Sequence, residues 1–108
     1  MTAAKRPRHS DAIARLRDAY EAVVSEIERD SDAESAFERA TELRTQLDRL
    51  VGEAAELRAR TVARLWEAEE LSLAALASRI GVSKGRASQF IQAAKAAEAA
   101  KQAGDDDV

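Results

Sequence analysis

The chain has 108 residues, which is enough for one small domain with a modest hydrophobic core. It contains no cysteine, so disulfides and thiolate metal sites are excluded, and its net charge of −3 argues against a general nucleic-acid coat protein. Alanine, leucine, glutamate and arginine dominate, as is typical of all-helical proteins. No apolar run approaches the roughly 18 residues of a membrane span and no signal peptide is evident, so we expect a cytoplasmic protein without membrane contact.

The amino-terminal part predicts a basic arm followed by a helical hairpin. Residues 1–10 contain Lys5, Arg6 and Arg8 without an apolar period, and we interpret them as a disordered arm that is either inert or able to enter a DNA groove. Ser10 can cap a helix over 11–29 with apolar residues at helical spacing. The pattern from Ser31 to Glu34 is typical of a capping box that opens a second helix over 32–70. A connection this short predicts antiparallel neighbours.

The second helix has an apolar stripe that is longer than the first helix can cover. Gly52 lies inside this helix, either as a tolerated exposed glycine or as a hinge or close helix crossing. Tyr20 and Trp66 are expected in the core. Because the stripe outruns its partner, we predict a homodimer through the amino-terminal helices, with residues 11–57 as the hairpin. The stripe consists of Ala36, Ala40, Leu43, Leu47, Leu50, Ala54, Leu57 and Thr61.

Residues 58–101 contain the most informative segment, a predicted helix-turn-helix, and residues 102–108 are expected to form an acidic flexible tail. Ser72 can cap a helix over 73–80, and Gly81 can take the positive φ that the turn needs. Ser83 can cap a helix over 84–101. The apolar positions predict one buried face on each helix. These positions are Leu73, Leu76, Ala77, Ile80, Val82, Ala87, Phe90 and Ile91.

The segment LAALASRIGVSKGRASQFI resembles the helix-turn-helix of bacterial regulators, above all the kind found in sigma-factor region 4. The resemblance covers roughly residues 60–95. It implies that the second helix reads the DNA major groove. By motif position it places six residues toward DNA: Ser83, Lys84, Gly85, Ser88, Gln89 and Gln92. The chain is far too short for the promoter-melting and polymerase-docking regions of a sigma factor, so we expect no sigma activity.

Charge and polar side chains favour the same surface. Residues 71–104 have five basic residues and one acidic residue, whereas residues 11–60 have eight basic and thirteen acidic. Local positive charge is sufficient for phosphate contact. Gln89 and Gln92 are either solvated amides or readers of adenine. The other candidates for DNA contact are Ser72, Arg86 and Lys95, together with Arg79, which is either a surface charge or a phosphate contact.

No catalytic arrangement is recognisable, so we expect no enzyme, no cofactor and no metal site. The single histidine, His9, lies in the amino-terminal arm, and no glycine-rich phosphate loop follows a strand. The first hypothesis is therefore a homodimeric, sequence-specific protein that binds double-stranded DNA, such as a small transcriptional regulator. A plasmid partition or nucleoid-associated protein is a close relative of this idea. The alternative from another class is a helical adaptor that binds a protein, for example a polymerase subunit.

Overall fold

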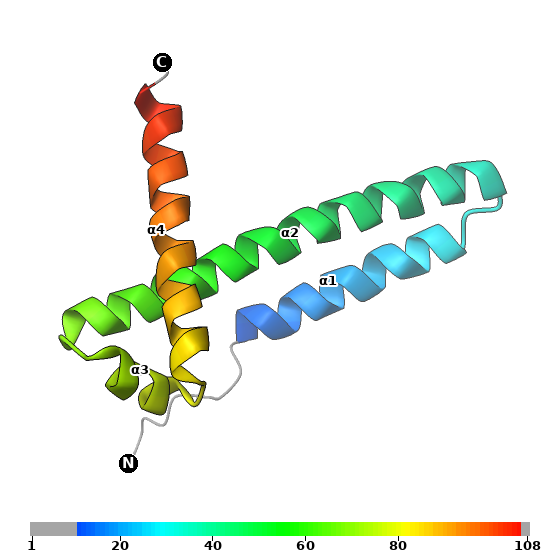
Figure 1. The fold of residues 1–108 in the computed structure, drawn as a ribbon. Helices are drawn as coiled ribbons and strands as arrows, with labels where there is room; N and C mark the ends of the chain where they lie inside the picture. The colour runs from blue at the N-terminus through cyan, green and yellow to red at the C-terminus, as the bar shows by residue number, and fades with distance from the viewer. Residues whose placement is uncertain (1–10, 107–108) are drawn as a thin grey trace, which may run out of the picture. The chain divides into compact units, whose positions relative to one another are not determined.

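The computed structural model describes residues 11–106, and within this range the chain forms four helices and no strand (Figure 1). The helices are α1 (Asp11–Glu28), α2 (Ala33–Ala68), α3 (Leu73–Ile80) and α4 (Lys84–Asp106). The all-helical prediction is confirmed. No helix in this range has both the length and the apolar composition needed to cross a membrane. Residues of the predicted arm, Lys5, Arg6 and Arg8, and the predicted cap Ser10 lie outside the described residues.

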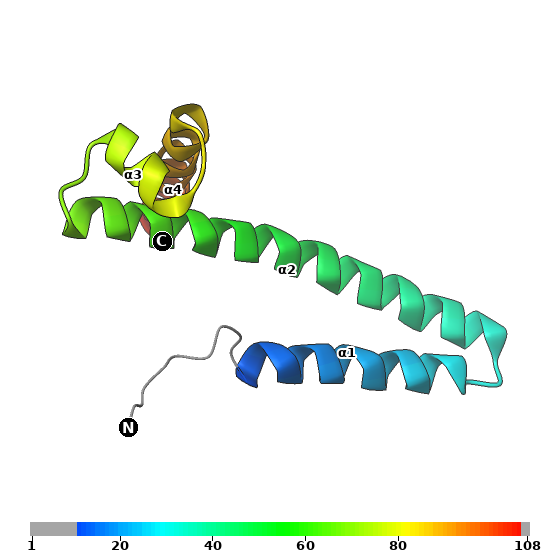
Figure 2. The same cartoon turned by 90° about the horizontal axis from the view of Figure 1, so that it is seen from below.

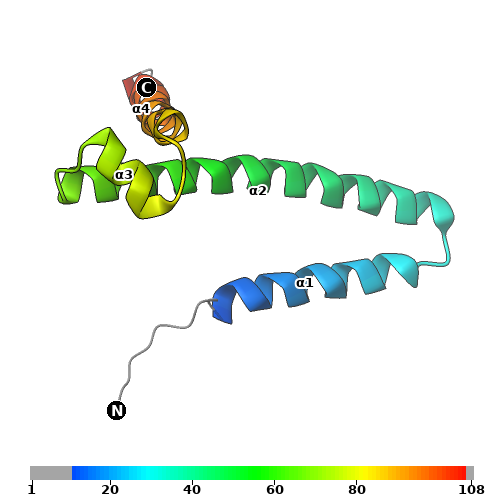
Figure 3. The same cartoon turned by 60° about the horizontal axis from the view of Figure 1, so that its bottom comes forward.

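The chain divides into two compact units, one ending at Gln46 and the other beginning at Leu47. In the first unit a tight connection reverses the chain between α1 and α2 (Figure 3). Asp32 begins α2, because its carboxylate accepts hydrogen bonds from the backbone amides of Glu34 (3.1 Å) and Ser35 (3.3 Å). The predicted capping box from Ser31 to Glu34 is therefore wrong: an aspartate one residue later takes the capping position.

Two carboxylates and one arginine link α1 to α2 close to the connection between them. Asp30 accepts the backbone amide of Asp32 at 2.9 Å, and this hydrogen bond is the main reason why the pKa of Asp30 is lowered. Arg39 of α2 contacts Glu26 of α1 at 3.2 Å and Asp30 at 3.5 Å. All of these groups are near the surface, so their ion pairs contribute little stability.

The first unit leaves much apolar surface uncovered. Helix α1 has no buried residue, and its Ile13 and Leu16 are 63% and 61% exposed. Tyr20, expected in the core, is 38% exposed, and Phe37 of α2 is 72% exposed. Between the two helices lies an open, mainly apolar groove of 380 Å³ that includes Val23, Ile27 and Leu43. Two helices alone cannot bury this surface, because each offers only one face to the other.

The second unit contains the rest of α2 together with α3 and α4, and Figure 2 shows α3 and α4 lying against the last part of α2. Its core consists of two clusters of buried apolar side chains, and the same half-buried residues, among them Val62 and Ile80, pack against both clusters. The fully or largely buried members are Ala59, Leu76, Ala77, Ala87, Phe90, Ile91 and Ala94. The half-buried residues packed against them are Val62, Ala63, Leu65, Trp66, Leu71, Leu73, Ile80 and Val82.

One helix boundary and one domain boundary differ from the sequence-based expectations, whereas Gly52 agrees with the alternative of a tolerated exposed glycine. Helix α2 continues through Gly52, where an added Cβ would meet nothing within 4 Å, so Gly52 neither ends the helix nor marks a close crossing within the described chain. Helix α4 continues through Gly104 to Asp106, whereas we expected a flexible tail from residue 102. Glu56 lies opposite the later turns of α4, so residues before 58 already belong to the second unit.

Candidate nucleic-acid interface

Local backbone chemistry sets the turn between α3 and α4. Ser72 begins α3 by accepting the amide of Ala75 on its hydroxyl oxygen at 3.1 Å. Gly81 has φ +75°, a backbone conformation that residues with a side chain rarely adopt. Its amide donates to the carbonyl of Ala77 at 2.9 Å. The next amide, that of Val82, donates to the same carbonyl at 3.0 Å, and the Val82 side chain packs against the core. The turn is thereby fixed by two hydrogen bonds to the end of α3 and by the packing of Val82 against the core.

Ser83 begins α4 as predicted. Its hydroxyl oxygen accepts the amide of Arg86 at 3.0 Å, and its carbonyl accepts the amide of Ala87 at 2.9 Å. The first amides of an α-helix have no acceptor within the helix. The Ser83 hydroxyl accepts the backbone amide of Arg86, so the backbone amides of Lys84 and Gly85 remain available to solvent or to a ligand. This end of α4 also has the positive pole of the helix dipole.

The buried face of α4 determines which residues remain accessible. Ala87, Phe90, Ile91 and Ala94 face the core, so the opposite side of the helix faces solvent. At about 100° per residue, Gly85, Gln89 and Gln92 lie near the middle of that accessible face, and Lys84 and Arg86 lie on its two edges. All five of these residues are exposed, while Ser88 is half-buried. The structure thus brings six predicted site residues onto one surface.

The polar side chains of this face are partly ordered by one another. Arg86 donates from Nη1 to Oε1 of Gln89 at 3.2 Å, and Gln92 donates from Nε2 to the Ser88 hydroxyl at 3.3 Å. These bonds are exposed and weak in water, so a ligand can replace them at little cost. Gly85 has no side chain, so the backbone of the first turn is bare, and the space beside it is open: an added Cβ would meet only the Ser83 hydroxyl oxygen, at 4.0 Å. A phosphate group can therefore approach this backbone closely.

Three other predicted residues have structural partners of their own. The Ser72 hydroxyl caps α3, and Arg79 pairs with both carboxylate oxygens of Glu69, at 2.9 and 3.0 Å. The Lys95 ammonium lies 5.8 Å from the centre of the Trp66 ring. Arg79 would have to leave or share its carboxylate to contact a phosphate, so the structure favours the surface-charge interpretation of this residue.

Sequence reasoning missed Arg58 of α2. Its guanidinium carbon lies 5.2 Å from the centre of the Phe90 ring, and that of Arg86 lies 4.3 Å from the same centre. Both distances are typical of cation–π contacts. The sequence feature that could have indicated Arg58 is its position on α2. It directly precedes the small buried Ala59 and lies four residues before Val62, at the edge of the packed face of the helix.

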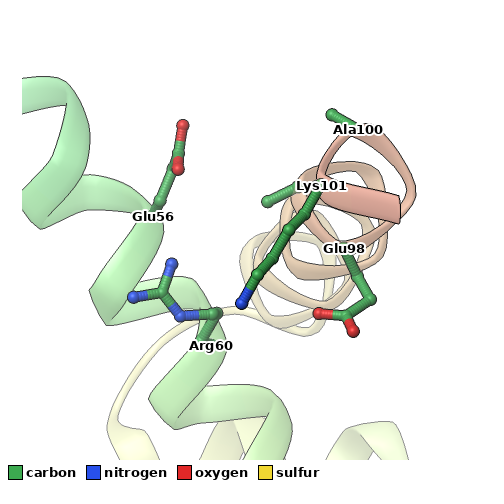
Figure 4. A pocket seen from close by; sticks show the side chains of 6 residues that line it. Glu56, Arg60, Glu98, Ala100 and Lys101 are labelled. Carbon is green, nitrogen blue, oxygen red and sulfur yellow. The ribbon is translucent and has the colours of Figure 1, made fainter. Parts of the chain in front are cut away.

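The second unit also contains a hollow between α2 and the later turns of α4, lined in part by Glu56, Arg60, Glu98 and Lys101 (Figure 4). Side chains of both signs enter it, so it has no clear preference for an anion or a cation. Within residues 11–106 no group of three or more histidine, aspartate or glutamate side chains could hold a metal ion. The accessible face of α4 is thus the best candidate site.

Comparison with known proteins gives no relative: no protein-family model, no curated protein and no solved structure matches this chain. The function therefore has to be argued from the site itself.

Proposed function

We propose that this protein binds duplex DNA in a sequence-specific manner by placing the first turns of α4 in the major groove. One observation carries the proposal: α4 begins with a capped, exposed and positively charged turn, while its opposite face is anchored in the core. A rigid helix end that presents amides, cations and glutamine side chains matches the chemistry of phosphates and base edges. The resemblance to helix-turn-helix regulators agrees with this function and suggests a small cytoplasmic transcriptional regulator.

The residues have different roles in this proposal. Lys84 and the exposed amides of Lys84 and Gly85 contact phosphates, because the helix N-terminus attracts anions. Gln89 and Gln92, in the middle of the accessible face, contact base edges, where an amide can both donate and accept. Phosphate contacts position the helix and the glutamines provide specificity.

Lys84→Ala tests the phosphate contact. We expect it to weaken binding to preferred and unrelated duplexes alike and to reduce the slope of log K against log salt concentration by about 1, because one phosphate contact is lost. Fluorescence anisotropy titrations at several salt concentrations measure both effects. The matched control is Lys101→Ala, which removes an exposed lysine from the far end of the same helix. Equal salt slopes for the two variants would exclude Lys84 from the interface.

We further propose a homodimer through the amino-terminal helices, because Ile13, Leu16 and Phe37 are more than half exposed in a single copy. A dimer with twofold symmetry would read two half-sites about 34 Å apart, or a multiple of that distance. We expect sedimentation equilibrium to show a dimer at tens of micromolar and Leu16→Glu to shift it to monomer without loss of helicity. A wild-type chain that stays monomeric with and without DNA would contradict the dimer.

The same exposed apolar residues favour a second candidate function, that of a helical adaptor for another protein. The two functions differ in a simple measurement. A regulator binds a selected duplex much more tightly than random DNA, and a partition or nucleoid-associated protein binds both with a smaller difference. For an adaptor we expect no difference between the selected duplex and random DNA. We also expect Lys84→Ala to leave the salt dependence of any residual DNA binding unchanged.

A further inference from the structure

Two arginines from different helices share one aromatic ring at the edge of the candidate interface. Arg58 belongs to α2 and Arg86 to the first turn of α4, and both guanidinium groups lie within 6 Å of the centre of the Phe90 ring. Phe90 itself is only 9% exposed, so its position is fixed by the core of the second unit. The ring therefore anchors both guanidinium groups at a defined place on the surface.

The charges of this pair are not neutralised within the described part of the chain. Among residues 11–106, neither Arg58 nor Arg86 has a carboxylate within 4 Å, and the one hydrogen bond of Arg86 leads to the neutral Gln89. Two positive charges that contact the same ring repel each other, and an anion that contacts both of them lowers that repulsion. A guanidinium group resting on a ring keeps N–H donors at its edge free for a planar or tetrahedral oxyanion.

We propose that Arg58 and Arg86 form a phosphate clamp for the backbone of one DNA strand. This inference rests on the proposed function. Arg86 lies on the edge of the accessible face of α4 opposite to Lys84, so the two residues reach phosphates on opposite sides of the major groove. Arg58 extends the phosphate-binding surface from Arg86 onto α2. The protein surface that contacts DNA thus includes a helix that lies outside the helix-turn-helix segment.

Arg58→Met tests the clamp, because methionine keeps an unbranched apolar side chain beside Phe90 while removing the charge. The matched control is Arg64→Met, which removes another exposed arginine from α2. We expect Arg58→Met to bind both a selected and an unrelated duplex roughly tenfold more weakly and to lower the salt slope by about 1, in contrast to the control. Arg58→Lys should restore the salt slope more fully than the affinity, because it returns the charge without the planar donors.

The outcomes separate this inference from the proposed function. If wild type binds DNA and Lys84→Ala weakens it, but Arg58→Met matches Arg64→Met, the clamp is wrong and the proposed function stands. If the wild-type chain does not bind duplex DNA, both are wrong. Thermal unfolding of each variant by circular dichroism shows that the fold is intact. If Arg58→Met lowers the unfolding temperature, the comparison is made below it, and a salt slope equal to that of wild type then overturns the clamp.

Discussion

Leu76→Ala is expected to lower the free energy of unfolding by about 2–5 kcal/mol, because it removes a fully buried side chain. Among the residues that the structure describes, Leu76 is the largest fully buried side chain, with 0% exposure, and it lies where α3 and α4 meet the end of α2. Its removal leaves a cavity that the surrounding helices can fill only in part. In a small domain this loss is a large share of the total stability.

Urea unfolding measures this effect with two probes, far-ultraviolet circular dichroism for all helices and fluorescence of Trp66, which packs against the same cluster. Leu50→Ala is the control, because Leu50 is 45% exposed and its truncation should cost less than about 1 kcal/mol where the chain is monomeric. Equal effects of the two substitutions would mean that the second unit does not have the core described above.

Gln89→Ala is expected to weaken binding to the preferred duplex by about 1–3 kcal/mol, or roughly 5- to 150-fold, and to change binding to random DNA little. Gln89 lies in the middle of the accessible face of α4, and its hydrogen-bond partner within the chain is Arg86. The loss is specific because an amide that reads a base contributes nothing on a duplex that lacks that base. Arg86 keeps its contact with Phe90 in the variant, so the phosphate contacts persist.

The preferred duplex is obtained by selection from random DNA with the wild-type chain, and affinities are then measured for that duplex and a shuffled one. Gln102→Ala serves as the control, since Gln102 is an exposed glutamine in the later turns of the same helix. Equal affinities of the Gln89 and Gln102 variants for the preferred duplex would remove Gln89 from the interface. If Lys84→Ala is also without effect, the adaptor function becomes the better explanation.

The turn between α3 and α4 could be predicted from sequence because its determinants are local. Ser72 and Ser83 cap the helices that directly follow them, and Gly81 provides the one left-handed residue that the turn requires. The buried face of α4 follows from the spacing of Ala87, Phe90 and Ile91 in the same way. These features depend on a few neighbouring residues, so the tertiary structure does not alter them.

Other predictions were wrong where two local signals compete or where the outcome depends on packing. At the start of α2, Ser31 and Asp32 can both cap a helix, and the aspartate does so. Tyr20 has the spacing of a core residue, yet no element of the described chain covers it fully. The end of α4 was placed too early because an acidic, glycine-containing end is typical of a tail, whereas the alanine-rich run continues the helix.

The candidate site could likewise be predicted only in part from the sequence. The polar face of α4 follows from helical periodicity, so Lys84, Gln89 and Gln92 were found from the sequence alone. Arg58 was not found, because its contact with the Phe90 ring depends on how α2 and α4 cross at Ala59 and Phe90. A crossing of this kind is a property of the folded unit and leaves only a weak trace in the spacing of residues.

The uneven packing of α4 has a consequence for how the protein opens. Among residues 84–104, whose burial the structure describes, buried residues occur only between Ala87 and Ala94, and every residue from Glu98 to Gly104 is exposed. The later turns therefore persist through the intrinsic helix propensity of alanine and through propagation from the packed half. They can fray and re-form many times while the core stays closed. Local unfolding at this end is decoupled from global unfolding, and the turns that carry Lys84 and Gln89 belong to the cooperative part of the helix.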